Sequence, residues 1–243
     1  MRVAVISDVH GNLAALDAVL EEIRRAELDA VWCLGDTVGY GPRPNECCAL
    51  VRERCAIVLG GNHDFVVAGT LEIDSFSAAA RDAAEWTQTV LDDESLQFLR
   101  GLDPVARAEG CALYHGSARD PVWEYVLDEQ SARASLELAQ AEVVLVGHSH
   151  LALAISLHDG RIEGGLAPAT TEPLLRAKER WLLNPGSVGQ PRDGDPRAAW
   201  LQLDLALGRA RFNRVRYDVA ATQRAMRDAG LPQTLANRLG TGT

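Results

Sequence analysis

The stretch Gly60-Gly61-Asn62-His63-Asp64 decides how the rest of the chain is interpreted. It follows a short apolar run at residues 56–59, which predicts a buried strand that ends at the two glycines. Glycine lets the main chain turn sharply and approach a bound ion closely. We therefore expect an amide, an imidazole and a carboxylate to lie exposed at a strand end, where open α/β sheets place their sites. Ordinary turns use the same residues, so this stretch alone does not identify a site.

The composition is typical of a globular protein without a membrane-spanning part. The chain has 243 residues, of which 47% are hydrophobic, enough for one large domain or two small ones. No apolar run approaches the roughly 18 residues of a membrane span, and the apolar opening ends at Asp8, too early for a signal peptide. We expect a cytoplasmic protein with a single domain over residues 1–243, comprising a core at about 1–217 and C-terminal helices at about 218–239.

The charged residues and the cysteines exclude several classes of protein. A formal net charge of −10 disfavours an extended nucleic-acid surface. Lys178 is the single lysine and no glycine-rich lysine motif exists, which argues against a Walker-type or Schiff-base site. The five cysteines form no CxxC pair, so we expect reduced, buried thiols.

Strands and helices alternate through the first 60 residues. Apolar spacing predicts strands at 2–7, 30–34 and 56–59, a helix from Leu13 capped by Asn12, and a helix that begins at Pro44. This alternation predicts parallel strands with right-handed crossovers, whose ends open on the same side.

The remaining elements are expected from the same patterns. Residues 75–101 predict one or two helices, capped by Ser77 and by Asp92 or Asp93, that cover the cleft or pack beside it. Asp159-Gly160 predicts a hairpin turn, and residues 164–179 a loop. The other expected strands are 105–108, 111–114, 143–146, 151–157, 181–183, 198–205 and 209–217; the other expected helices are 131–140, 219–229 and 235–239.

Four further polar clusters follow apolar runs, and with the first they supply carboxylate, amide and imidazole groups. The candidate ligands are Asp8, His10, Asp36, Asn62, His115, His148 and His150. Such donors suit Mn²⁺, Fe, Co²⁺, Ni²⁺ or Zn²⁺, and seven of them fit two ions that share a carboxylate better than one tetrahedral zinc. Side chains two apart on a strand face the same way, so we expect Asp8 with His10, and His148 with His150, to converge on one ion each. One such pair could equally be surface polar groups or a hydrogen-bonded core histidine, but five clusters favour a dinuclear site.

Asp-x-His, Gly-Asp, Gly-Asn-His-Asp, a lone His and Gly-His-x-His, in that order, resemble the calcineurin-like metallophosphoesterase superfamily over about residues 1–205. The stretch Asn184-Pro185-Gly186-Ser187-Val188 further resembles its smaller bacterial phosphodiesterase branch. The resemblance implies an α/β fold, a four-layer α-β-β-α sandwich of two mixed β-sheets flanked by helices.

The same resemblance implies roles for individual residues. One ion would be held by Asp8, His10, Asp36 and His150, and the other by Asp36, Asn62, His115 and His148. His63 would be a catalytic histidine that binds no metal, and Asp64 the acid that orients it. A hydroxide that bridges the two ions would attack phosphorus while His63 protonates the leaving group. We expect Mn²⁺ as the activating ion.

One departure from the family limits the choice of substrate. The block Gly35–Gly41 lacks the Asp-Arg pair of protein Ser/Thr phosphatases and diadenosine-tetraphosphate hydrolases, whose arginine grips phosphate. We therefore expect a phosphodiesterase for small phosphodiesters, with a phosphomonoesterase or dinucleoside-polyphosphate hydrolase as the alternative and a metal-binding scaffold without turnover as a third reading. Residues that could face substrate, or simply be loop residues, are Asn12, Tyr40, Arg43, Ser117, Arg119 and Arg192. The sequence does not indicate an oligomeric state.

Overall fold

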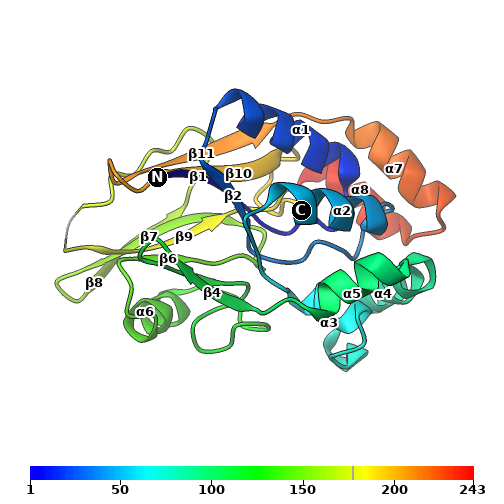
Figure 1. Ribbon diagram of the computed structural model, residues 1–243, viewed down its shortest axis with the longest axis horizontal. Helices are drawn as coiled ribbons and strands as arrows, with labels where there is room; N and C mark the ends of the chain where they lie inside the picture. The colour runs from blue at the N-terminus through cyan, green and yellow to red at the C-terminus, as the bar shows by residue number, and fades with distance from the viewer. Residues whose placement is uncertain (177) are drawn as a thin grey trace.

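Two β-sheets lie between layers of helices in the computed structural model, which describes residues 1–176 and 178–243 (Figure 1). The five-stranded sheet has the order β11-β10-β1-β2-β3, with β1 (Arg2–Ile6), β2 (Ala30–Cys33), β3 (Ile57–Val58), β10 (Ala198–Asp204) and β11 (Arg209–Val215). The six-stranded sheet has the order β4-β5-β6-β9-β7-β8, with β4 (Val105–Ala108), β5 (Cys111–Tyr114), β6 (Val143–Leu145), β7 (Ala152–His158), β8 (Arg161–Leu166) and β9 (Arg180–Pro185). Both sheets mix parallel and antiparallel pairs, as predicted.

Hydrophobic clusters hold the four layers together. Between the sheets, Val5 and Trp32 of one pack with Leu113 and Leu145 of the other. Helices α1 (Leu13–Arg25) and α2 (Pro44–Arg54) cover the outer face of the five-stranded sheet. Helix α6 (Glu129–Leu138) covers the outer face of the six-stranded sheet, and Figure 1 shows α1 and α6 on opposite sides.

The first three strands run parallel, so the loops that follow them meet at the same edge of the sheet. Asn12 begins α1 as predicted, because its side-chain oxygen accepts a hydrogen bond from the Ala15 amide at 3.3 Å. Pro44 is the first residue of α2, where its missing N–H costs no hydrogen bond.

The region 75–101 forms two helices, α4 (Ala78–Val90) and α5 (Asp93–Arg100), capped by Ser77 and Asp92. The short helix α3 (Asn62–Val67) precedes them, with a 3₁₀ turn at Ile73–Ser75 between α3 and α4. Helix α6 begins two residues before its predicted start, because Asp128 accepts a hydrogen bond from the Ser131 amide.

The prediction of a loop at 164–179 was wrong at its beginning. Strand β8 continues to Leu166 and pairs with β7 alone, at the edge of its sheet. Its side chains are therefore largely exposed, and Gly164-Gly165 interrupts the apolar alternation by which a strand is recognised. Residue 177 of the predicted loop lies outside the described residues.

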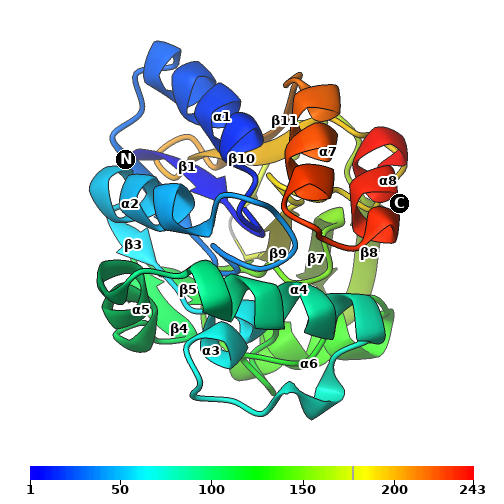
Figure 2. The ribbon, with the colours of Figure 1, turned by 90° about the vertical axis from the view of Figure 1, so that its right-hand side faces the viewer.

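The chain ends in a helical hairpin of α7 (Val219–Asp228) and α8 (Gln233–Thr241), which stand side by side in Figure 2. Buried residues of the hairpin, Met226 and Leu239 among them, pack with Ala83 of α4 and with Tyr40. The hairpin thus supports the loop that follows β2.

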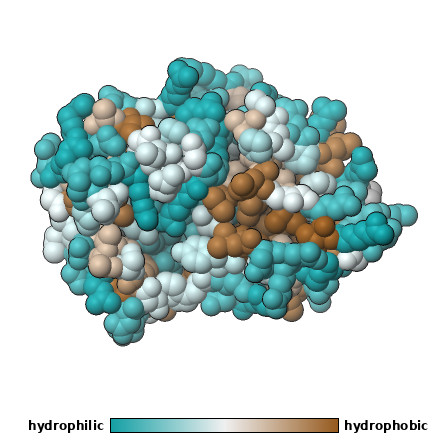
Figure 3. Space-filling model, turned by 180° about the vertical axis from the view of Figure 1, so that it is seen from behind, coloured by the Kyte–Doolittle hydropathy of each residue, from teal (hydrophilic) through white to brown (hydrophobic). Residues whose placement is uncertain are grey.

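Large hydrophobic side chains are mostly internal. Viewed from the side opposite to Figure 1, the surface is largely hydrophilic, with its most extensive hydrophobic area near the middle and smaller ones scattered around it (Figure 3). Within the described residues, no helix combines the length and the apolar character that crossing a bilayer requires.

Candidate metal centre

The candidate ligands come from loops that follow β1, β2, β5 and β6 and from the first residue of α3. Two groups of ligand atoms form there, the atoms of each group lying within 4.8 Å of one another. One group comprises Asp8, His10, Asp36 and His150; the other comprises Asp36, His115 and His148. Asn62 adjoins the second group, with Oδ1 3.2 Å from His115 Nε2. The structure thus brings all seven sequence-predicted residues together, with Asp36 common to both groups.

The candidate ligands point inward, but strand alternation is not the reason. Strands β1 and β6 end at Ile6 and Leu145, before the ligand pairs, and His148 and His150 belong to different groups. Left-handed backbone conformations, at a cost of about 1–2 kcal/mol each, turn the side chains inward instead. The five residues concerned are Asp8 (φ 55°), His10 (φ 50°), Asp36 (φ 53°), His148 (φ 62°) and His150 (φ 58°).

The centre is buried rather than exposed at a strand end. Asn62 and His63 are each 4% exposed and Asp64 is fully buried, because α3 begins at once and packs under the loops. Gly61 allows the close approach: a Cβ atom there would lie 2.1 Å from Asp36 Oδ1. That oxygen accepts a hydrogen bond from the His63 amide at 2.9 Å, which ties α3 to the loop after β2.

Main-chain carbonyl oxygens fix three of the imidazoles. The Nδ1 atoms of His10, His115 and His150 lie 3.0, 2.9 and 2.6 Å from the carbonyl oxygens of Val38, Leu34 and Gln190, respectively. An Nδ1–H group must be the donor in each contact, so in the neutral ring the lone pair is on Nε2. This arrangement of a metal-binding histidine, with its other nitrogen held by a carbonyl oxygen, is common in proteins.

The Nε2 atoms converge in a way that calls for a cation. His10 Nε2 and His150 Nε2 are 3.1 Å apart, and two lone pairs at this distance repel each other. Asp8 Oδ1 and Asp36 Oδ2 are buried without a hydrogen-bond partner in the described part of the chain. They lie 3.4 Å from His150 Nε2 and His115 Nε2. Divalent cations would satisfy all of these atoms, so the residues present fit such metals.

Burial and charge set the protonation of the centre. Burial raises the pKa of Asp8 to about 7. Burial acts to lower the pKa of His115, but the charge and hydrogen bond of Asp36 and the charge of Asp8 together outweigh it, and the pKa rises to about 9. Burial would raise the pKa of Asp36, yet His115 and His63 hold it well below its usual range. A metal ion that binds here therefore displaces a proton from His115.

His148 is held by a loop that sequence reasoning missed. Its Nε2 lies 3.2 Å from the Trp123 carbonyl oxygen, and its ring stacks on Tyr125 at 3.9 Å with the planes 9° apart. The donating Nε2–H leaves Nδ1 to face the second group. No local pattern marks these aromatic residues, because only the packing of the loop before α6 brings them to the centre.

His63 lies beside the candidate ligands without belonging to either group. Its ring centroid is 4.3 Å from that of Tyr40 and 4.4 Å from that of Phe76, and burial lowers its pKa to about 4. Its Nδ1 has no hydrogen-bond partner in the part of the chain that the structure describes. Gly39 makes room for it, since a Cβ there would lie 2.5 Å from Nδ1.

Asp64 does not hydrogen-bond His63, contrary to the expected orienting role. Its Oδ1 accepts from the Val38 amide and its Oδ2 from the Gly61 amide, both at 3.0 Å. As the third residue of α3, its side chain points back to the start of the helix and not toward its neighbour. Asp64 therefore joins two loops, and aromatic packing positions His63.

Among the residues expected to face substrate, Tyr40 lies at the centre, where its ring is 4.6 Å from that of His10. Of the other five, Arg192 lies next to Tyr40, with Nη2 3.4 Å from its hydroxyl, and four have structural roles. Asn12 caps α1 and donates to the Gly189 carbonyl oxygen; Arg43 is exposed and pairs with Glu46; Ser117 and Arg119 both bind Glu124 within the loop before α6. These four side chains are engaged by partners within the protein, which the sequence did not reveal.

The stretch Asn184-Pro185-Gly186-Ser187-Val188 supports the ligand loops from behind. The Asn184 side chain donates to the Gly147 carbonyl oxygen at 2.7 Å, and the Ser187 hydroxyl donates to the Asp8 carbonyl oxygen at 2.8 Å. It thus connects the loop after β6 with the loop after β1.

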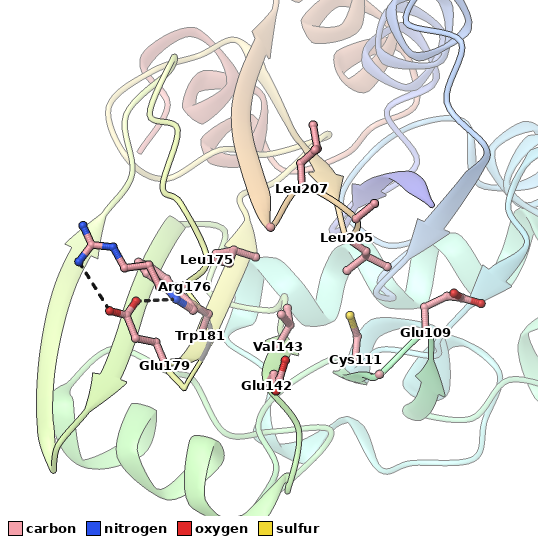
Figure 4. A pocket seen from close by; sticks show the side chains of 13 residues that line it. Glu109, Cys111, Glu142, Val143, Leu175, Arg176, Glu179, Trp181, Leu205 and Leu207 are labelled. Carbon is pink, nitrogen blue, oxygen red and sulfur yellow. Dashed lines mark hydrogen bonds and ion pairs between the residues drawn. The ribbon is translucent and has the colours of Figure 1, made fainter.

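A cavity of about 370 Å³ lies at the other end of the strands (Figure 4). It is lined by Cys111 and Val143, the first residues of β5 and β6, whereas His115 and His148 follow the last residues of these strands. Glu179, Arg176 and Trp181 interact on its wall. The cavity is therefore separate from the candidate metal centre.

Comparison with known proteins agrees with this geometry. The family model of the calcineurin-like phosphoesterase superfamily domain matches residues 1–205. An uncharacterized protein of Methanocaldococcus jannaschii is 34% identical over 251 residues, covering 99% of this chain and 98% of that protein. The phosphodiesterase YfcE of Escherichia coli is 26% identical over 214 residues, covering 84% and 88%. The crystal structure of a metallophosphoesterase from Sphaerobacter thermophilus has 39% sequence identity and a TM-score of 0.89, covering 100% and 99%.

Proposed function

Because the chain belongs to the calcineurin-like phosphoesterase superfamily, whose members hydrolyse phosphoesters with divalent metals, we propose that it is a phosphodiesterase with a centre of two metal ions. The observation that carries the proposal is the pair of buried ligand groups that share Asp36. Two groups with a common carboxylate are the arrangement that dinuclear hydrolases use.

The proposed ligands divide as the two groups do. Asp8, His10, Asp36 and His150 hold one ion; Asp36, Asn62, His115 and His148 hold the other. Two such ions lower the pKa of a bound water molecule and polarise the phosphoryl oxygens. Oxygen and imidazole donors without thiolate suit Mn²⁺, Fe, Co²⁺, Ni²⁺ or Zn²⁺, and of these we propose Mn²⁺ as the activating ion.

His63 acts on the leaving group in this proposal. It is buried beside both ligand groups, and its ring is fixed between Tyr40 and Phe76. Burial lowers its pKa to about 4, and the negative charge of a bound phosphoester would act in the opposite direction. A positioned acid of this kind assists the departure of an alkoxide, which is a poor leaving group.

Small phosphodiesters are the proposed substrates. The block Gly35–Gly41 lacks the Asp-Arg pair, and the nearest arginine in sequence is Arg43. Arg43 pairs with Glu46 and therefore supplies no free cation to a doubly charged monoester. The likeness to a bacterial phosphodiesterase supports the same choice.

Turnover of two aryl esters tests the proposal. With the Mn²⁺-loaded protein at one pH, kcat/KM for bis(p-nitrophenyl) phosphate should exceed that for p-nitrophenyl phosphate. Faster monoester turnover would favour a phosphomonoesterase. No turnover of either ester by protein that holds its metal would favour the scaffold.

A further inference from the structure

Arg192 is a cation beside the candidate metal centre that forms no ion pair with any residue in the ranges 1–176 and 178–243. Other arginines of the surrounding loops are neutralised: Arg119 by Glu124, Arg197 by Asp195 and Arg214 by Asp193. Arg192 is therefore a cation that remains available to an anionic ligand of the centre.

Neutral groups hold the Arg192 guanidinium in place. Its Nη2 donates to Gln190 Oε1 at 2.9 Å and to the Tyr40 hydroxyl at 3.4 Å, and its Cζ lies 5.9 Å from the centroid of the Tyr40 ring. Gln190 is buried, and its carbonyl oxygen accepts the hydrogen bond from His150 Nδ1. The same residue therefore orients a candidate metal ligand and Arg192, which fixes their relative positions.

The charge of Arg192 reaches across the centre. It acts to lower the pKa of Asp8 and of His63, although burial is the larger influence on both groups. It also acts to lower the pKa of Tyr125, against the larger effect of burial, and the Tyr125 ring stacks on His148. The guanidinium is partly exposed and has N–H donors beyond those used, so it can bind a ligand that enters the centre.

We propose that Arg192 binds a non-bridging oxygen of the substrate's phosphoryl group and thereby determines how well the site accepts a doubly charged phosphoryl group. A planar guanidinium suits this task because it donates two hydrogen bonds in a fixed geometry to phosphate oxygens. This inference rests on the proposed phosphoester hydrolysis. In it, Arg192 supplies the phosphate-binding cation that the block Gly35–Gly41 lacks.

If Arg192 binds the phosphoryl group, the effect of removing it depends on the charge of the ester, whereas a purely structural role would affect both esters equally. A monoester dianion has two anionic charges on its phosphoryl oxygens and a diester has one, so loss of Arg192 should weaken the monoester more. The ratio of kcat/KM for bis(p-nitrophenyl) phosphate to that for p-nitrophenyl phosphate should therefore rise in Arg192→Met, whichever ester the wild-type protein prefers.

The experiment compares wild-type protein with Arg192→Met, Arg192→Lys and the control Arg24→Met, whose guanidinium is exposed and pairs with Glu21. Metal content, kcat and KM for both esters, and calorimetric binding of inorganic phosphate to the Mn²⁺-loaded protein are measured. For Arg192→Met we expect unchanged metal content, phosphate affinity about 10- to 100-fold weaker and a loss that falls mainly on KM. Arg192→Lys should recover part of the affinity, and Arg24→Met should behave as wild type.

Unchanged phosphate affinity in Arg192→Met, or equal losses for both esters, would overturn the role of Arg192. If the wild-type protein turns over neither ester, the proposed function fails, but phosphate binding still decides whether Arg192 binds an anion.

Discussion

Asp36 is the residue on which the two ligand groups depend. Its Oδ2 lies 3.6 Å from His10 Nε2 and 3.4 Å from His115 Nε2, while its Oδ1 accepts a hydrogen bond from the His63 amide. One carboxylate therefore links the loop after β2 with both groups and with α3.

Substitution of Asp36→Asn should abolish binding of both ions and nearly all turnover, because an amide supplies neither the charge nor the second oxygen that a shared ligand needs. Elemental analysis at saturating Mn²⁺ should find two ions in the wild-type protein and less than one in the variant. Asp29→Asn, at an exposed site where the carboxylate accepts from the Arg2 amide, serves as control and should keep both ions. A single ion per wild-type chain would contradict the prediction.

His63→Ala tests the proposed acid. The variant should keep both ions, because His63 belongs to neither ligand group, and turnover should fall about 10²–10⁴-fold. The loss should shrink for esters with leaving groups of low pKa, which depart without a proton. Loss of metal from the variant, or an equal loss for all leaving groups, would argue against this role.

Asp8 makes metal binding depend on pH. Its folded pKa, raised to about 7 by burial, lies above the ordinary value of 3.8, so between these values the folded metal-free protein binds more protons than the unfolded chain. The contribution of Asp8 to the free energy of unfolding therefore falls as pH rises from about 4 to 7. A metal ion stabilises the ionised carboxylate and reverses this loss.

We therefore expect the increase in Tm on adding Mn²⁺ to be larger at pH 8 than at pH 5.5. The metal-free Asp8→Asn variant should lack the part of the pH dependence that Asp8 causes. An increase in Tm that is independent of pH would show that proton competition at Asp8 is unimportant.

At the scale of elements, the C-terminal hairpin is part of the support of the centre although it lies beyond the family match at 1–205. Met226 of α7 packs in one buried cluster with Tyr40, whose ring contacts His10 and His63. The Thr222 hydroxyl also donates to Asn12 Oδ1 at 3.3 Å. Packing thus couples the two helices to the loops after β1 and β2.

Met226→Ala should reduce the free energy of unfolding by about 2–5 kcal/mol, because it leaves a cavity against Tyr40. It should also lower kcat, since Tyr40 then no longer fixes the His63 ring. Denaturant unfolding and steady-state kinetics check both effects, with the exposed Arg227→Ala as the control on the same helix. Lower stability with unchanged kcat would show that the hairpin does not position the catalytic residues.

At the scale of the whole molecule, the centre exists because two sheets meet face to face. Asp36 follows a strand of the five-stranded sheet, whereas His115 and His148 follow strands of the six-stranded sheet. The core between the sheets, to which Trp32 and Leu113 both belong, sets how close these loop ends come. Neither sheet alone would form a complete ligand group around Asp36.

The amino-acid sequence by itself determined most of the helices and strands and indicated which side chains are candidate ligands. Periodic apolar residues and local caps such as Asn12 and Ser77 fix helices through contacts within a few residues, so these patterns are visible in the chain. The order of polar clusters after apolar runs indicated seven candidate ligands, and the ends of strands from both sheets bring these side chains close together.

Only the tertiary structure decided how these side chains are used. Left-handed loop residues send His148 and His150 to different groups, Asp64 binds amides of two loops instead of His63, and Arg192 rather than Arg43 reaches the centre. Each outcome depends on contacts between segments far apart in the chain, such as His148 with Trp123 and Tyr40 with Met226. Local sequence patterns encode local hydrogen bonds and burial, whereas the direction of a loop side chain follows from the partners that the whole fold brings to it.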